Sequence, residues 1–173
     1  TFFRDADAAK AAAEEVDAEL LAPRSWGRGM KEYQDAVTAL ERGRNIETVR
    51  SNAADAATHF KTATEAALLA KTHLAQALKS RQDAANAMAP SLSPELWTDA
   101  QQTFLRAVQT LERGDLRNSK RREIEATTLY RDAELDAIKI QYLADTRQLL
   151  ADAKRARVDR YAPITYNKAT ELL

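Results

Sequence analysis

The sequence predicts an all-α protein built from repeated modules, each with one short helix and one long helix. Only four Gly and four Pro occur in 173 residues, and most of them fall where a helical pattern breaks. The stretch from Pro23 to Gly43 matches the stretch from Pro94 to Gly114 at eight of 21 positions when it is shifted by 71 residues. No segment alternates as a strand would. We therefore expect a duplicated helical unit.

The helices are expected over about 2–21, 24–42, 46–88, 94–113, 116–160 and from 164 onward. Each short helix starts at a proline, which suits the first helical turn because that turn needs no N–H donor there. Gly43 and Gly114 suit the left-handed residue that follows a helix. Asn45 and Asp115 then suit the N-cap of the next helix. This spacing predicts tight hairpins between antiparallel neighbours.

The repeat extends beyond the short helices. After each glycine the shift becomes 70 residues because Arg44 has no counterpart in the second copy, and Phe60 then matches Tyr130. A third copy begins at Pro163, where Tyr166 takes the place of a tryptophan. The repeating unit is one short helix followed by one long helix. The best-matched pairs are Trp26/Trp97, Tyr33/Phe104, Val37/Val108, Leu40/Leu111 and Glu41/Glu112.

The apolar spacing predicts how these helices pack. Trp26, Met30, Tyr33, Val37 and Leu40 recur at intervals of 4, 3, 4 and 3 residues, which is the spacing of a packed helical seam. A long helix of about 65 Å is too long for one short helix to cover. We expect spectrin-like three-helix bundles joined by continuous long helices. The predicted modules are residues 1–66, 67–136 and an incomplete third module at 137–173.

Composition excludes several classes of function. Lys and Arg total 26, and Asp and Glu also total 26, so no net field would attract nucleic acid. The absence of cysteine removes disulfides and thiolate chemistry. No apolar run reaches the roughly 20 residues that span a bilayer. Because the sequence starts without Met, we expect a piece of a longer protein or a processed product.

No pattern of residues indicates catalysis, a cofactor or a metal. His59 and His73 have Ala, not Glu, three residues before them, so the Glu-x-x-His metal motif is missing. An acidic cluster and two basic patches are expected to be solvated and paired faces. The acidic cluster is Glu14, Glu15 and Asp17; the basic patches are Arg117, Lys120, Arg121 and Arg122, and Lys154, Arg155, Arg157 and Arg160.

Four residues are candidates for an interaction site or groove: Trp26, Gly27, Gly29 and Trp97. The indole rings of Trp26 and Trp97 suit stacking on a ligand. Their equivalent positions in the two copies of the repeat instead favour a shared role in core packing. Gly27 and Gly29 would each weaken the helix by about 1 kcal/mol relative to alanine. Either another backbone approaches closely at that point, or the first turn of the helix frays.

The repeated signature resembles a bacterial alanine-rich helical domain of unknown function that is found N-terminal to OmpA-like peptidoglycan-binding domains in envelope lipoproteins. Its carriers here are Ala22 to Trp26 with Leu40 to Gly43, Pro94 to Gly114, and Tyr161 to Tyr166. The resemblance implies a periplasmic, outer-membrane-associated spacer or interaction arm, with peptidoglycan contacted through flanking segments. It supplies no catalytic residues, and neither an OmpA-like domain nor a lipidated cysteine is present.

Three functional hypotheses follow. The first is a non-enzymatic structural or protein-interaction segment that acts as a spacer or scaffold of the cell envelope and has a protein partner. The second is a binding module that holds a peptide, glycan or lipid in a groove between bundles. The third is a homo-oligomer formed through the apolar long-helix centres near Leu68 and Ile138.

Overall fold

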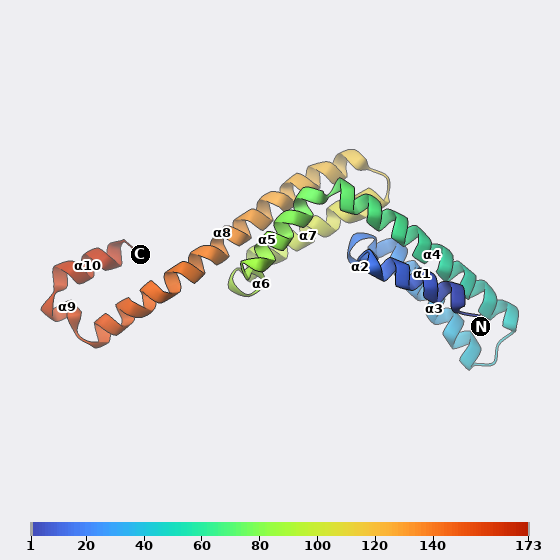
Figure 1. Ribbon diagram of the computed structural model, residues 1–173, viewed down its shortest axis with the longest axis horizontal. Helices are drawn as coiled ribbons and strands as arrows, with labels where there is room; N and C mark the ends of the chain where they lie inside the picture. The colour runs from blue at the N-terminus through green and yellow to red at the C-terminus, as the bar shows by residue number, and fades with distance from the viewer. Residues whose placement is uncertain (1, 173) are drawn as a thin grey trace. The chain divides into compact units, whose positions relative to one another are not determined.

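The computed structural model describes residues 2–172, and these residues form helices and no strand (Figure 1). The all-α prediction is therefore confirmed. In chain order the helices are α1 (Arg4–Glu15), α2 (Ala18–Leu21), α3 (Pro23–Glu41), α4 (Ile46–His73), α5 (Ala75–Asn86), α6 (Ala89–Leu92), α7 (Pro94–Glu112), α8 (Leu116–Arg155), α9 (Val158–Tyr161) and α10 (Pro163–Glu171).

The first part of the chain is a three-helix bundle of α1, α3 and α4. α4 packs along both other helices, and its buried residues are mostly alanines spaced three or four apart around the fully buried Phe60. Alanine allows close approach of helix axes, and the Phe60 ring, packed against Trp26 and Tyr33, fills the remaining volume. The core thus combines many small side chains with a few large ones.

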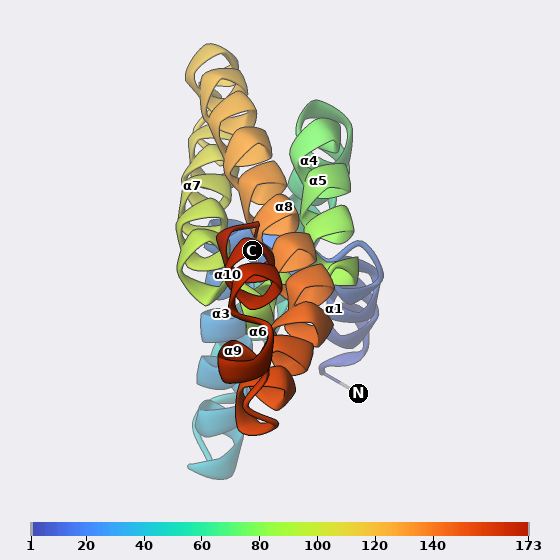
Figure 2. The ribbon, with the colours of Figure 1, turned by 90° about the vertical axis from the view of Figure 1, so that its left-hand side faces the viewer.

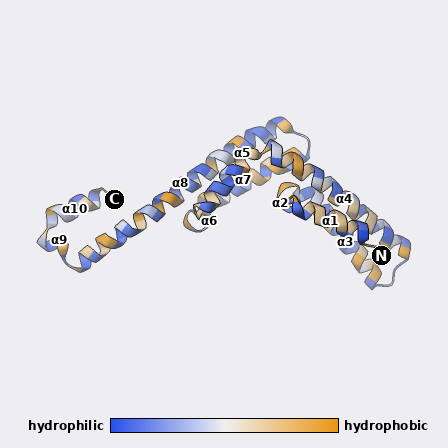
Figure 3. Cartoon of the chain, in the orientation of Figure 1, coloured by the Kyte–Doolittle hydropathy of each residue, from blue (hydrophilic) through white to orange (hydrophobic). Residues whose placement is uncertain are grey.

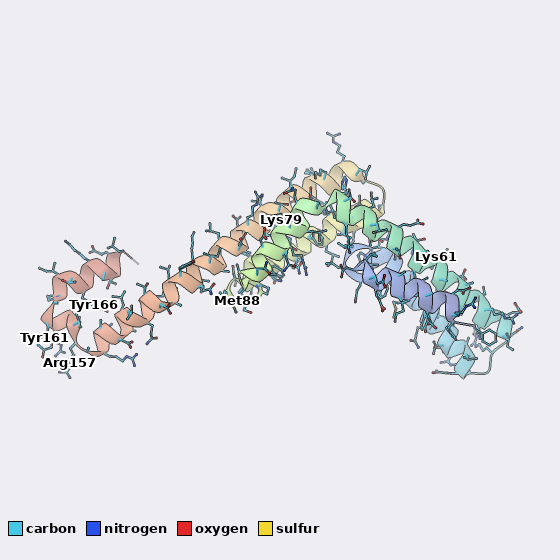
Figure 4. The ribbon with its side chains drawn as sticks, viewed as in Figure 1. Lys61, Lys79, Met88, Arg157, Tyr161 and Tyr166 are labelled. Carbon is cyan, nitrogen blue, oxygen red and sulfur yellow. The ribbon has the colours of Figure 1, made fainter. Side chains whose placement is uncertain are left out.

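The same corner occurs three times, at Asp17, Met88 and Arg157. Each of these residues is left-handed, with φ of 58°, 63° and 59°, and each ends the helix before it. A four-residue helix follows, and a proline then starts the next helix. In Figures 1 and 2 the chain turns at α9, so that α10 runs opposite to the end of α8. Met88 and Arg157 are labelled at two of these corners in Figure 4.

The predicted hairpins are confirmed at both glycines. Gly43 has φ +61° and Gly114 has φ +83°, the left-handed conformation that glycine adopts without a steric penalty. Backbone N–H groups of Arg44 and Asp115 reach back to the carbonyls of Ala39 and Thr110, at 2.9 and 3.2 Å. The Asn45 side chain accepts a hydrogen bond from the Glu47 N–H at 3.0 Å. It therefore caps α4 as expected.

The prediction of an unbroken helix over 46–88 is wrong. α4 ends at His73 and α5 begins at Ala75, with Leu74 between them at φ −109° and ψ 25°. No Pro or Gly marks this break, and Leu74 itself is fully buried. The helices expected over 2–21 and 116–160 likewise end early, at the corners of Asp17 and Arg157. α8, in contrast, runs unbroken through Leu116–Arg155.

Two compact units interleave along the chain. One unit comprises Thr1–Lys79 with Gln101–Thr127, and the other comprises Ser80–Ala100 with Thr128–Leu173. In the second unit the parts of α5, α7 and α8 pack around Trp97 and Tyr130. The predicted modules at 1–66, 67–136 and 137–173 are contiguous stretches, and that division stays a prediction.

Hydrophilic and hydrophobic residues are interspersed along the helices in Figure 3. Among residues 2–172, no helix combines the length and the apolar character that crossing a bilayer requires.

Candidate interaction site

Trp26 and Gly29 belong to the core of the first bundle. The Trp26 ring lies 5.2 Å from the Phe60 ring, and the interplanar angle is 55°. Gly29 faces the same ring: a Cβ at this position would lie 2.7 Å from two Phe60 carbons. A side chain, not a backbone, therefore requires the glycine, and α3 stays helical from Pro23. Both alternatives expected for Gly29 are corrected by this contact.

Gly27 plays no comparable role, because a Cβ at this position would meet nothing within 4 Å. Trp97 repeats the contact of Trp26 in the second unit, with its ring 5.4 Å from that of Tyr130 and the Arg81 guanidinium 5.6 Å from its centroid. Burial raises the pKa of the Tyr130 phenol, because desolvation penalises the phenolate. Trp26 and Gly29 thus lie in the first bundle and Trp97 in the second unit, whereas Gly27 is exposed. A ligand groove formed by them stays a prediction.

The polar contacts with the clearest geometry lie elsewhere, at the start of α3. The Glu112 carboxylate, from the last turn of α7, accepts hydrogen bonds from the backbone N–H groups of Arg24 and Ser25, each at 3.1 Å. The Ser25 hydroxyl donates a third bond to it at 3.0 Å. The first N–H groups of a helix have no intrahelical acceptor. A carboxylate from the second copy of the repeat therefore caps the short helix of the first copy.

A second carboxylate acts in the same way at the break in the long helix. The Glu123 side chain is 1% exposed and accepts a hydrogen bond from the Gln76 N–H, in the first turn of α5, at 3.1 Å. The ammonium group of Lys120 pairs with its other oxygen. A buried carboxylate is tolerated only when it is paired and hydrogen-bonded. Glu123 thus accounts for the N–H freed where the helix breaks at Leu74.

Further contacts hold the α7–α8 tip within the first unit. The tip is defined here as residues 111–116, and the equivalent α3–α4 tip as residues 40–46. His73 Nε2 lies 3.3 Å from the Leu116 carbonyl oxygen, and the Ser119 hydroxyl donates to the Ala107 carbonyl at 2.9 Å. Lys71 pairs with Asp17 at 3.2 Å, which ties the first corner to α4. His73 thus lies where the end of α4 meets the α7–α8 tip.

The charged patches found in the sequence are partly paired. In the acidic cluster, Glu14 pairs with Lys10 at 3.4 Å and Asp17 pairs with Lys71. In the basic patches, Lys120 pairs with Glu123 and Arg155 pairs with Asp152. These contacts agree with the expectation of solvated and paired faces.

Sequence reasoning identified Glu112 as a repeated residue but missed its acceptor role, and it missed Glu123 as well. One signal was available for Glu123. Its counterpart at a shift of 70 residues is Ala53, which is buried against the first bundle. A carboxylate at a position where the other copy has a buried alanine indicates a buried polar partner.

Surface hollows lie at the two ends of the repeated module. One is next to the α3–α4 tip and is lined by Glu32, Asp35, Thr38, Ala39, Arg42, Arg44, Thr48 and Asn52. Two others adjoin the start of α7 in the second unit. Their linings are Pro94, Glu95, Thr98 and Asp99, and Leu92, Ser93, Pro94, Glu95, Leu96 and Asp136. No family model, curated protein or solved structure matches this chain.

Proposed function

We propose that this chain is a non-enzymatic helical repeat segment that acts as a spacer or scaffold and binds other proteins. The observation that carries the proposal is the joint at which Glu112 caps α3 and Glu123 caps α5. Each carboxylate comes from the second copy of the repeat and satisfies a helix end that belongs to the first. A spacer needs such joints because it must hold one module in a fixed position relative to the next.

The proposal places the segment in the periplasm, associated with the outer membrane, because its signature resembles the helical domain that precedes OmpA-like domains. Flanking segments would then supply any contact with peptidoglycan. Protease protection in intact cells, lost when the outer membrane is permeabilised, is the expected result for the parent protein. Protection that persists until the inner membrane is lysed would contradict a periplasmic location.

Pulsed electron–electron double resonance, which measures the distance between two spin labels, tests the spacer role directly. The chain has no cysteine, so Lys61→Cys and Arg121→Cys place one spin label on α4 and one on α8, both at exposed positions of the first unit. A single narrow distance distribution is expected in dilute monomer. Glu112→Ala combined with Glu123→Ala should broaden it, because both capped joints are lost. A broad distribution in the parent chain would count against a spacer.

A matched control separates the joints from general damage to the fold. Glu41→Ala changes the residue equivalent to Glu112, but Glu41 is exposed at the α3–α4 tip. It should leave the distance distribution unchanged. Broadening by Glu41→Ala as large as that caused by Glu112→Ala would show that the capped joint is not what fixes the distance.

A further inference from the structure

The contact in which Glu112 of the α7–α8 tip caps the start of α3 is a template for a second contact of the same kind. At the α7–α8 tip, Leu111 is 4% exposed, and the neighbouring Glu112 caps the start of α3. At the α3–α4 tip, the equivalent Leu40 is 47% exposed, whereas Ile46 and its counterpart Leu116 are similarly exposed, at 52% and 51%. The same hairpin therefore has one copy that is covered by a helix start and one that is not.

The chain also contains a second helix start of the required form. α7 begins after Ser93 with φ −134° and ψ 57°, and α3 begins after Ala22 with φ −146° and ψ 53°. The N–H groups of Glu95 and Leu96 are equivalent to those that bind Glu112 in the first copy. Two of the hollows described above adjoin this helix start. The second copy thus repeats the geometry of the receiving surface.

Charge distinguishes the two receiving surfaces. Beside the start of α7 lie Glu95, Asp99 and, from α8, Asp136, whereas the equivalent residues of the first copy are Arg24, Arg28 and Ala66. The uncovered tip differs in the opposite sense. Its hollow is lined by Glu32 and Asp35 as well as by Arg42 and Arg44, and Arg44 adds a positive charge that has no counterpart in the other tip. The acidic surface is thus complementary to the uncovered tip.

From these observations we propose that a second copy of this chain docks its α3–α4 tip on the start of α7, so that copies associate head to tail. Glu41 of one copy accepts from the N–H groups of Glu95 and Leu96 of the next. Arg44 faces the acidic surface formed by Glu95, Asp99 and Asp136. The two surfaces differ, so the contact is heterologous, and each copy offers one tip and one surface to its neighbours.

The docked tip should bind more weakly than the joint inside the chain. Leu96 replaces Ser25 and has no hydroxyl to donate, so one of the three hydrogen bonds to the carboxylate is lost. Much of the attraction is then between exposed charges, which salt screens. The inference rests on the proposed interaction role. The labelling experiment above uses dilute monomer, so either proposal can fail without the other.

Sedimentation velocity of the whole chain tests the proposal. From about 10 µM to about 1 mM, the weight-average mass should rise above that of one copy, and it should fall as salt increases from about 0.05 M to about 0.5 M. Arg44→Glu and Glu95→Arg should each lower the association constant about tenfold, because each places like charges opposite one another. Both side chains are exposed, so the fold is retained.

Mixing the two variants gives the decisive result. The Arg44→Glu tip is complementary to the Glu95→Arg surface, and the remaining tip and surface of the pair are unchanged, so the mixture should recover association to within about threefold. Arg131→Glu, an exposed reversal on α8 outside both surfaces, should have no effect. Single-copy mass at every concentration, or a mixture without recovery, would overturn the proposal.

Discussion

The α3–α4 tip and the α7–α8 tip share the sequence Leu-Glu-Arg-Gly, yet their surroundings differ. Leu40 is 47% exposed, whereas Leu111 is 4% exposed. Both glycines are left-handed and both following helices have a side-chain cap. Local chemistry therefore makes the two tips alike in conformation, and a neighbouring helix start makes them unlike in burial and in what a substitution would cost.

The largest expected effect comes from a position that is aromatic and buried in both copies, Phe60 in the first and Tyr130 in the second. Phe60 is fully buried between Trp26 and Gly29, so Phe60→Ala should lower the free energy of unfolding by about 3–5 kcal/mol. Chemical denaturation followed by circular dichroism measures this loss. Gly29→Ala should also destabilise the first bundle, because its Cβ would overlap the ring. Gly27→Ala, which meets nothing, is the matched control.

The second prediction tests the difference in burial between Leu111 and Leu40. Leu111→Ala should cost about 2–5 kcal/mol of unfolding free energy, within the range for a buried leucine. Leu40→Ala should cost less than about 1 kcal/mol, because half of that side chain is already in water. Denaturation midpoints of the two variants, measured side by side, give the comparison. Equal losses would mean that the exposed tip is covered in solution.

The third prediction concerns the capping carboxylates. Glu112→Gln keeps the shape of the side chain but removes its charge, and should cost about 1–2 kcal/mol of unfolding free energy by weakening the bonds to Arg24 and Ser25. Glu41→Gln should change stability by less than about 0.5 kcal/mol in dilute solution. The first amides of α3 should exchange hydrogen more slowly in the parent chain than in Glu112→Gln. That difference would locate the effect at the start of α3.

The smallest expected effect distinguishes the two N-caps by pH. The hydrogen bonds from the Asn118 side chain and backbone hold the pKa of Asp115 below its ordinary value. An Asp with a lowered pKa stabilises the fold above its ordinary pKa, and that contribution is lost as pH falls through the lowered value. The stability gap between the parent chain and Asp115→Asn should therefore close in acid.

The neutral cap of the other tip gives the control for this pH effect. The Asn45 side chain has no charge to lose, and its bond to the Glu47 N–H persists in acid. The gap between the parent chain and Asn45→Ala should thus stay nearly constant over the same pH range. A gap for Asp115→Asn that stays open in acid would contradict the assigned role of the charge.

The sequence by itself determined what depends on neighbouring residues. Prolines at helix starts, glycines after helix ends and Asn45 as a cap each act within a few residues, so the hairpins and the duplicated module follow from local pattern. The repeat also identified Trp26 and Trp97 as equivalent, and both pack on the aromatic ring of a long helix.

Only the tertiary structure decided the features that join distant segments. The break at Leu74 has no Pro or Gly signal, and the freed N–H of Gln76 is satisfied by Glu123, 47 residues away. Met88 and Arg157 are of types that rarely adopt the left-handed conformation, and Asp17 is of a type that adopts it only occasionally, so local propensity does not predict the three corners. Which tip is covered depends on a helix start far along the chain, because burial is set by packing between segments and not by the residues of the tip alone.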